Sequence, residues 1–314
     1  MDSETEQLLA TLELLTEPSL PFDLPGHEDG GYLVPFVWDV SERGEFNVLN
    51  LSYAEGWLQL TDINALIQIG QYYLDFFPIY AHGYDENSAR RNNKIKLLLQ
   101  LLSINLEGLE ALKLEAKSPR VVPNPPVGIV VGRTKDGDWI AACPTVYKAT
   151  EIPEQYIARS PQSEETSDKP LGKTTLDLIA QIEAISSDIG VIHLEGDFGG
   201  GYCYAYDHQI IYTVAQTKEL VFKRILQLSG ILEINQFHAF YPDKSYFEDD
   251  CDSYETYKFY LRYEELVQFL NQSFDKILMY RFSFWSLEYI YIIGQTQLGN
   301  EVGLHLASEF IYNP

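Results

Sequence analysis

Two stretches of this chain follow one pattern: Ile129-Val130-Val131-Gly132-Arg133-Thr134-Lys135-Asp136-Gly137-Asp138-Trp139-Ile140 and Tyr291-Ile292-Ile293-Gly294-Gln295-Thr296-Gln297-Leu298-Gly299-Asn300-Glu301-Val302. Each consists of an apolar strand, the motif Gly-x-Thr-x-x-Gly, and a second strand. Asp136-Gly137 favours a tight turn because glycine adopts a positive φ without a Cβ clash, and Leu298-Gly299 can turn for the same reason. A hairpin that occurs twice indicates an internal duplication.

The segments that precede each hairpin also recur in the same order. Each half begins with a helix that has one apolar face. Two strand candidates follow and are expected to form an antiparallel ribbon. A mixed helical stretch, an acidic loop and a clearly amphipathic helix then lead to the hairpin. In this order, the first half contains 8–15, 34–39, 46–51, 62–77, 83–87 and 95–109, and the second contains 178–185, 202–207, 210–214, 218–232, 246–252 and 266–277.

Each half therefore predicts the order α-β-β-α-α-β-β, an α+β fold in which helices cover an antiparallel sheet. The order of the strands within the sheet does not follow from the sequence. Residues 151–173 are poor in apolar residues and rich in residues typical of linkers. We therefore expect two tandem domains at 1–150 and 174–314, joined by a linker at 151–173.

The composition is strongly acidic: 46 Asp and Glu stand against 22 Lys and Arg, which gives a net charge of −24. A field of this sign repels nucleic acids and anionic membranes and attracts basic proteins and cations. It favours a protein partner, with no direct binding to nucleic acid or membrane; the alternative is that the charge serves solubility alone. The three cysteines do not form a disulfide framework, and the acidic N-terminus lacks a signal-peptide core. Both observations predict a cytoplasmic location, while the oligomeric state stays open.

Four stretches of the first half resemble the nuclease A inhibitor-like family, bacterial inhibitors of a sugar-non-specific, metal-dependent nuclease. The second half resembles it through the acidic loop, the long helix and the hairpin with Gly299-Asn300. The order of these stretches carries the resemblance, since none is specific alone. They are Thr16–Phe22, Gln59–Asn64, Tyr84–Asn87 and Val130–Thr134 in the first half, and Tyr246–Asp250 and Ile292–Thr296 in the second.

The resemblance implies an α-β-α sandwich that blocks a nuclease active site with a loop glutamate and the end of its last strand. Glu17 matches that glutamate, whereas Ser186-Ser187 occupies the corresponding place in the second half. In the single-domain inhibitor the chain ends in a threonine that reaches the nuclease metal. Thr150 matches this position, but the chain continues beyond it, so Thr150 has no free carboxylate.

The predicted function is that of an acidic module that binds a protein, with a nuclease as the implied target. Solvated loops that cap the following helices are the alternative interpretation of the acidic residues. The predicted partner-binding residues are Glu17, Asp85, Glu86, Thr150, Glu248, Asp249 and Asp250.

We predict no catalytic residue, metal site or cofactor. The acidic run at 248–255 lacks the ligand spacing and internal glycine of an EF-hand. Gly199–Gly201 is followed by a strand candidate and not by the Lys-Ser/Thr pair of a phosphate-binding loop. Two other functions stay open: a scaffold whose two copies have diverged to different partners, and an enzyme in which carboxylates or a Cys–His pair converge in the fold.

Overall fold

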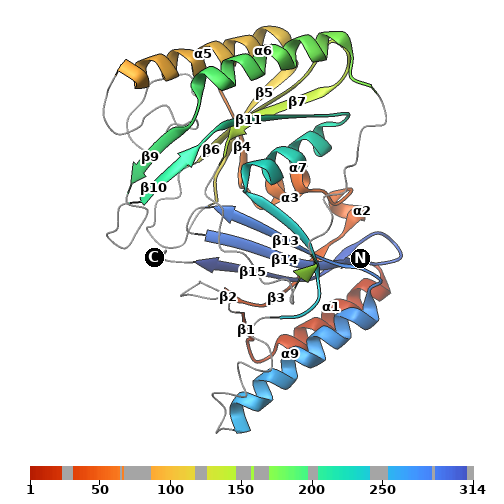
Figure 1. Cartoon of the computed structure of the whole chain (residues 1–314). Helices are drawn as coiled ribbons and strands as arrows, with labels where there is room; N and C mark the ends of the chain where they lie inside the picture. Colours follow the sequence, from red (N-terminus) through yellow and green to blue (C-terminus); the bar gives the residue numbers. More distant parts are fainter. Residues whose placement is uncertain are drawn as a thin grey trace. The chain divides into compact units, whose positions relative to one another are not determined.

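The structure is a computed structural model, which describes residues 1–22, 31–63, 66, 86–116, 126–145, 157–158, 170–196, 204–240, 254–284 and 287–309. Antiparallel sheets pack against helices (Figure 1), which confirms the predicted α+β class. The chain divides into two compact units, and each of them takes segments from both halves of the sequence.

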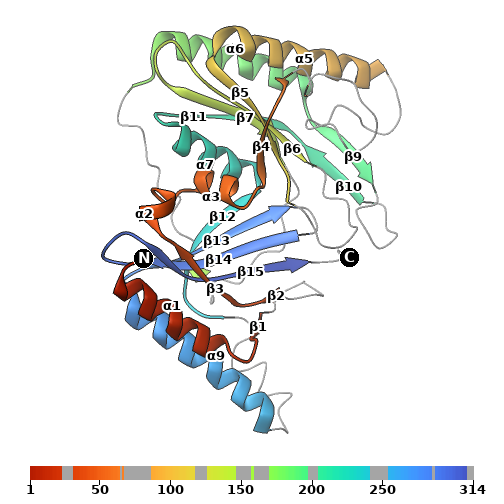
Figure 2. The ribbon, with the colours of Figure 1, turned by 180° about the vertical axis from the view of Figure 1, so that it is seen from behind.

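The first unit comprises Met1–Phe46, Ala149–Glu164 and Glu233–Pro314. Its sheet has the strand order β3-β15-β14-β13-β12-β8, and a short β1-β2 hairpin accompanies it. Helices α1 and α9 lie side by side along this sheet (Figure 2). The elements are α1 (Ser3–Thr16), β1 (Pro21–Phe22), β2 (Gly31–Tyr32), β3 (Val34–Trp38), α2 (Val40–Arg43), β8 (Ile157–Ala158), β12 (Leu232–Phe237), α9 (Tyr254–Ser273), β13 (Ile277–Phe284), β14 (Leu287–Gln295) and β15 (Glu301–Glu309).

The core of the first unit lies between the two helices and the sheet. Leu12 of α1 and Leu266 of α9 are completely buried, and both belong to one apolar cluster with Ile290 and Ile292 of β14. Burial of such a side chain stabilises the fold by about 1.5–3 kcal/mol. The predicted apolar helix faces therefore form this core.

The second unit comprises Asn47–Lys148 and Glu165–Leu232. Its sheet has the order β11-β7-β6-β5-β4, and β9 and β10 form a separate two-stranded sheet. The elements are α3 (Val48–Ala54), β4 (Leu58–Thr61), α5 (Glu86–Asn105), β5 (Glu107–Leu114), β6 (Val127–Arg133), β7 (Trp139–Pro144), α6 (Lys173–Ile189), β9 (Ile192–Gly196), β10 (Tyr204–His208), β11 (Ile210–Ala215) and α7 (Lys218–Ser229).

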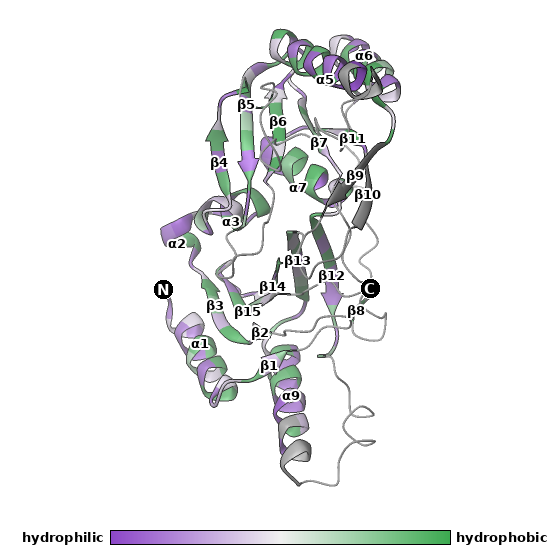
Figure 3. Cartoon of the chain, turned by 90° about the vertical axis from the view of Figure 1, so that its left-hand side faces the viewer, coloured by the Kyte–Doolittle hydropathy of each residue, from purple (hydrophilic) through white to green (hydrophobic). Residues whose placement is uncertain are grey.

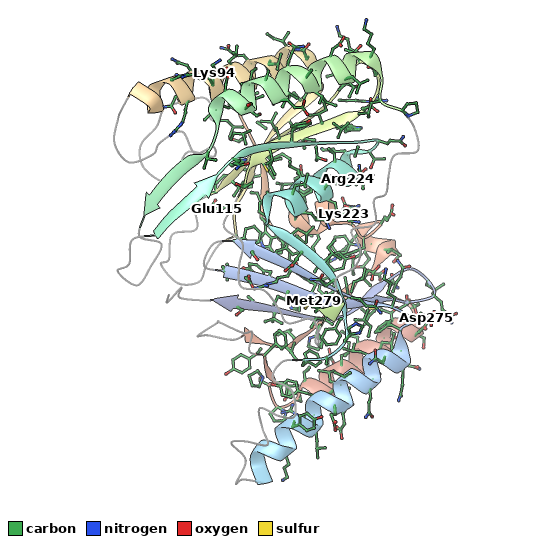
Figure 4. The ribbon with its side chains drawn as sticks, viewed as in Figure 1. Lys94, Glu115, Lys223, Arg224, Asp275 and Met279 are labelled. Carbon is green, nitrogen blue, oxygen red and sulfur yellow. The ribbon has the colours of Figure 1, made fainter. Side chains whose placement is uncertain are left out.

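Helices cover the sheet of the second unit on both faces. Leu98 of α5 and Ile182 of α6 pack in one apolar cluster with Val130 of β6, and α7 packs against β6, β7 and β11. The helices carry both hydrophobic and hydrophilic residues (Figure 3), as amphipathic helices on a sheet must. Lys94 of α5, labelled in Figure 4, forms an ion pair with Asp188 of α6. The second unit is therefore an α-β-α sandwich.

The predicted strand at 46–51 is wrong, because most of this segment belongs to helix α3. Asn47 caps the helix: its Oδ1 accepts a hydrogen bond from the Asn50 backbone amide at 2.8 Å. A side-chain acceptor that binds a backbone amide three residues on favours a helix start over a strand. The predicted ribbons are also wrong, because β3 pairs with β15, β10 with β9 and β11 with β7.

The compact units do not coincide with the predicted domains 1–150 and 174–314, because each unit combines both halves. Within the predicted linker 151–173, β8 pairs with β12 through Ala158 and Ile157. The predicted helices at 218–232 and 266–277 correspond to α7 and α9, although α7 ends at Ser229 and α9 at Ser273. Most of the helix predicted at 62–77, residues 83–85 of the first acidic loop and all of the second loop lie outside the described residues, and the first loop ends where α5 begins at Glu86.

Candidate partner-binding site

The site begins with the loop that follows α1 and carries Glu17. Helix α1 ends at Thr16, whose hydroxyl donates to the Leu12 carbonyl oxygen at 2.9 Å, and Glu17 then adopts an extended conformation with φ −93° and ψ 130°. Pro18 follows through a cis peptide bond. Glu17 and Pro18 are exposed, whereas Leu20 is completely buried. The loop is thus anchored at both ends and presents the Glu17 carboxylate to solvent.

Helix α9, from the second half of the sequence, holds the backbone of this loop. The Arg262 guanidinium donates from Nη2 to the carbonyl oxygens of Leu15, at 3.4 Å, and Pro18. The Tyr263 hydroxyl donates to the carbonyl oxygen of Pro21, on β1. Hydrogen bonds from a charged donor are stronger than those between neutral groups. The loop is therefore mounted on a rigid helix, which reduces the conformational entropy that binding would cost.

Glu17 is the only predicted site residue whose side chain falls within the described part of the chain. Glu86 begins α5, but its side chain is outside the description. The remaining predicted residues, Asp85, Thr150, Glu248, Asp249 and Asp250, lie outside the described residues. The structure therefore does not test whether these groups share one surface with Glu17.

Two sites at which a hairpin turn hydrogen-bonds the first turn of a helix were not predicted from the sequence, and we call each of them a polar seat. In the second unit, the Thr175 hydroxyl lies 2.8 Å from the Thr134 hydroxyl and donates to Asp138 Oδ2 at 2.8 Å. The Thr175 backbone amide donates to Asp136 Oδ2 at 2.9 Å, which lowers the pKa of Asp136. Gly172 must lack a side chain because a Cβ there would lie 2.2 Å from the same Asp136 oxygen.

The corresponding seat in the first unit is built by Asn300 and Asp2. The Asn300 amide donates to Asp2 Oδ2 at 2.8 Å and to the Thr5 hydroxyl at 3.0 Å. The Thr5 hydroxyl and backbone amide donate to Asp2 at 2.7 and 3.0 Å, which lowers the pKa of Asp2. The repeated Gly-x-Thr-x-x-Gly motif signals both seats, but sequence alone does not show which helix each hairpin meets.

A buried ion pair between neighbouring strands was also missed. Arg281 of β13 donates from Nε to Glu288 Oε2 of β14 at 2.7 Å, and Ser283 donates to Glu288 Oε1 at 2.8 Å. Arg281 is 1% exposed and Glu288 is completely buried. Opposite charges on two adjacent apolar strands were the signal that could have predicted this pair.

Among the described residues, no group of three or more His, Cys, Asp or Glu side chains could hold a metal ion. The buried Cys143 thiol has its pKa raised by desolvation, so its reactive thiolate form is disfavoured. In the same part of the chain, no helix is both long and apolar enough to cross a membrane.

Comparison with known proteins gives a match for residues 203–308, to the family model described as nuclease A inhibitor-like protein. No match was found among the curated proteins. The matched segment runs from β10 to β15 and lies in the second half of the sequence. The resemblance of the first half stays a prediction. Over about a third of its length, this chain is thus similar to the nuclease A inhibitor-like family.

Proposed function

We propose that this protein is an acidic binding module that recognises a basic protein surface, with a sugar-non-specific, metal-dependent nuclease as the target. The observation that carries the proposal is the match of residues 203–308 to the nuclease A inhibitor-like family. The net charge of −24 supports it, because such a field accelerates encounter with a basic partner in a salt-dependent manner. In this proposal the chain acts by occupying the partner's surface and not by catalysis.

Glu17 is the residue that we assign to recognition in the first unit. Its carboxylate is exposed, and the backbone that carries it is held by Arg262 and Tyr263. A fixed carboxylate can form a bidentate pair with an arginine of the partner, which is the strongest form of such a contact. Ser186 and Ser187, which correspond to Glu17 in the sequence of the second half, lie inside helix α6 and have no carboxylate, so we assign the carboxylate contact to the Glu17 loop alone.

Inhibition and binding are tested together by mixing the full chain with the non-specific nuclease of the same source. We expect a complex on size-exclusion chromatography and a loss of nuclease activity, both weakened by salt. The absence of a complex and of inhibition at low salt would overturn the proposal. A complex without inhibition would retain recognition but reject the inhibitory role.

The contribution of Glu17 is measured with Glu17→Gln, which keeps the shape of the side chain and removes its charge. We expect affinity to fall about tenfold or more, since loss of about 1.4 kcal/mol is tenfold and truncated interface pairs cost this much or more. Glu13→Gln is the matched control, because Glu13 is also exposed and lies one turn earlier on α1. Equal losses in the two variants would show that net charge, and not the Glu17 contact, governs binding.

A further inference from the structure

Each of the two large sheets combines strands from both halves of the sequence. In the first unit, β3 from the first half pairs with β15, which continues into β14, β13 and β12 of the second half. In the second unit, β11 from the second half pairs with β7, which continues into β6, β5 and β4 of the first half. We propose that the chain is a duplicated module whose two copies have reciprocally exchanged their N-terminal helix and strand.

The two strands pair antiparallel with the second strand of the repeated hairpin, β3 with β15 and β11 with β7. Val37 lies opposite Val302, and Val214 lies opposite Ile140. Val302 and Ile140 occupy the same position of the repeated hairpin, two residues after Asn300 and Asp138. β3 and β11 thus occupy the same edge of the two hairpin copies, so β11, and not the strand predicted at 202–207, is the counterpart of β3 in a common module.

The family match supports the exchange independently. Residues 203–308 match as one continuous segment, yet this segment contributes β10, β11 and α7 to the second unit and β13, β14 and β15 to the first. A segment that is continuous in the family is therefore divided between two compact units here. The exchange accounts for this division, because it moves the beginning of each copy to the sheet of the other.

The two hairpin seats show why the exchanged pairing is electrostatically favourable. Helix α1 brings its own capping carboxylate, Asp2, and meets the hairpin that has an amide, Asn300, and the uncharged Leu298. Helix α6 begins at Lys173 after Gly172, which has no side chain to cap it, and meets the hairpin that supplies Asp136 and Asp138. Each helix start thus receives a capping carboxylate, as N-terminal backbone amides require.

If each half of the sequence folded as a separate domain, each helix start would meet the hairpin of its own half, and the match between helix starts and hairpins would be lost. Helix α1 would then meet the hairpin of its own half, and Asp2 would crowd with Asp136 and Asp138. Carboxylates held a few ångströms apart repel each other strongly when they are shielded from water. Helix α6 would meet Leu298 and Asn300 and lose its carboxylate cap. The side chains at these positions therefore fit the exchanged arrangement and disfavour the consecutive one.

The exchange makes the surface around Glu17 a product of both copies. Glu17 belongs to the first copy, while Arg262, which holds the backbone of its loop, belongs to the second. This inference does not depend on the identity of the partner, because it rests on strand pairing and on the two seats.

Cysteine cross-linking in the full chain tests the proposal directly. Val37→Cys combined with Val302→Cys places the two cysteines at directly opposed positions of β3 and β15, close enough to form a disulfide bond on mild oxidation. Val37→Cys combined with Ile140→Cys is the matched control, since this pair would be opposed only in consecutive domains. We expect an intrachain cross-link, located by peptide mass mapping, in the first variant and none in the second. Single-cysteine variants control for the natural cysteines.

Three results would overturn the exchange: cross-linking of the Val37/Ile140 pair, a cross-linked dimer in the Val37/Val302 variant, or no cross-link in either. The dimer would show that β3 is donated to another chain. A second measurement uses Asn300→Asp, which adds a carboxylate beside Asp2. We expect its melting temperature to fall, and Asp2→Asn to restore most of the loss. Restoration by Asp138→Asn in place of Asp2→Asn would favour consecutive domains.

Discussion

At the residue scale, the pair of Arg281 and Glu288 shows how an ion pair is stabilised inside an apolar sheet. Both side chains are buried, and Glu288 accepts from both Arg281 and Ser283. Arg281 Nη1 also lies 3.7 Å from the half-buried Glu233 carboxylate. Such groups tolerate burial because each charge has a partner, and removal of one partner leaves the other charge without compensation.

Arg281→Leu and Glu288→Leu are each expected to lower the free energy of unfolding by about 3–5 kcal/mol, because each removes the opposite charge that lies closest to a buried charge. The double variant is expected to lose much less than the sum, since it removes both charges. Urea denaturation of the two single variants and the double variant measures this coupling. Additive losses would show that the two side chains do not act as a pair.

At the element scale, the starts of α1 and α6 share a cap but obtain it from different places. Asp2 caps α1 from the preceding position in the chain, whereas α6 receives Asp136 from a hairpin far away in the sequence. The apolar faces of both helices were predictable from their periodicity, as were the hairpins from their Asp-Gly and Leu-Gly turns. The α3 segment was not predictable in this way, because its β-type residues favoured a strand over the helix start that the Asn47 cap supplies.

Acid is expected to weaken these helix starts. The pKa values of Asp2 and Asp136 lie below the ordinary 3.8, because each carboxylate accepts hydrogen bonds from the first turn of a helix. A group with a lowered folded pKa contributes stability above its unfolded pKa, and this contribution is lost as pH falls through the folded value. The stability of the protein should therefore decline below about pH 4.

Asp136→Asn is expected to make the loss of stability at low pH smaller, because the asparagine side chain does not titrate. Asp177→Asn is the control, since Asp177 is exposed on α6 beyond the capping position. Thermal unfolding between pH 2 and pH 6 measures the effect. If the melting temperatures of the wild type and Asp136→Asn fall by the same amount between pH 6 and pH 2, the acid sensitivity does not come from this cap.

At the scale of the whole molecule, each compact unit depends on both halves of the chain. A fragment of residues 1–150 contains β4 to β7 but lacks β11 and α6, which complete the second sheet and its apolar core. Its complement, residues 151–314, contains β8 and β12 to β15 but lacks β3 and α1. We expect either fragment alone to be unfolded or aggregated, and the two expressed together to form a folded complex.

Circular dichroism and size-exclusion chromatography of the separate and co-expressed fragments provide the measurement. Two fragments that fold independently, with cooperative thermal transitions and no association, would contradict the composite units. Chains that contain an incomplete sheet edge and an uncovered core are prone to association. We therefore expect the single fragments to be insoluble and the co-expressed fragments to be soluble.

The sequence by itself determined the α+β class, both closing hairpins and the helices α1, α5, α6, α7 and α9, because their periodicity and turn residues act within short stretches of chain. Only the tertiary structure decided which strand pairs with which and which hairpin meets which helix. Apolar strands of similar composition offer similar edges, so their pairing depends on contacts between residues far apart in the sequence. Asp2 with Asn300, and Asp136 with Thr175, are such contacts, and each pair is recognisable as a pair only once the fold has brought its members together.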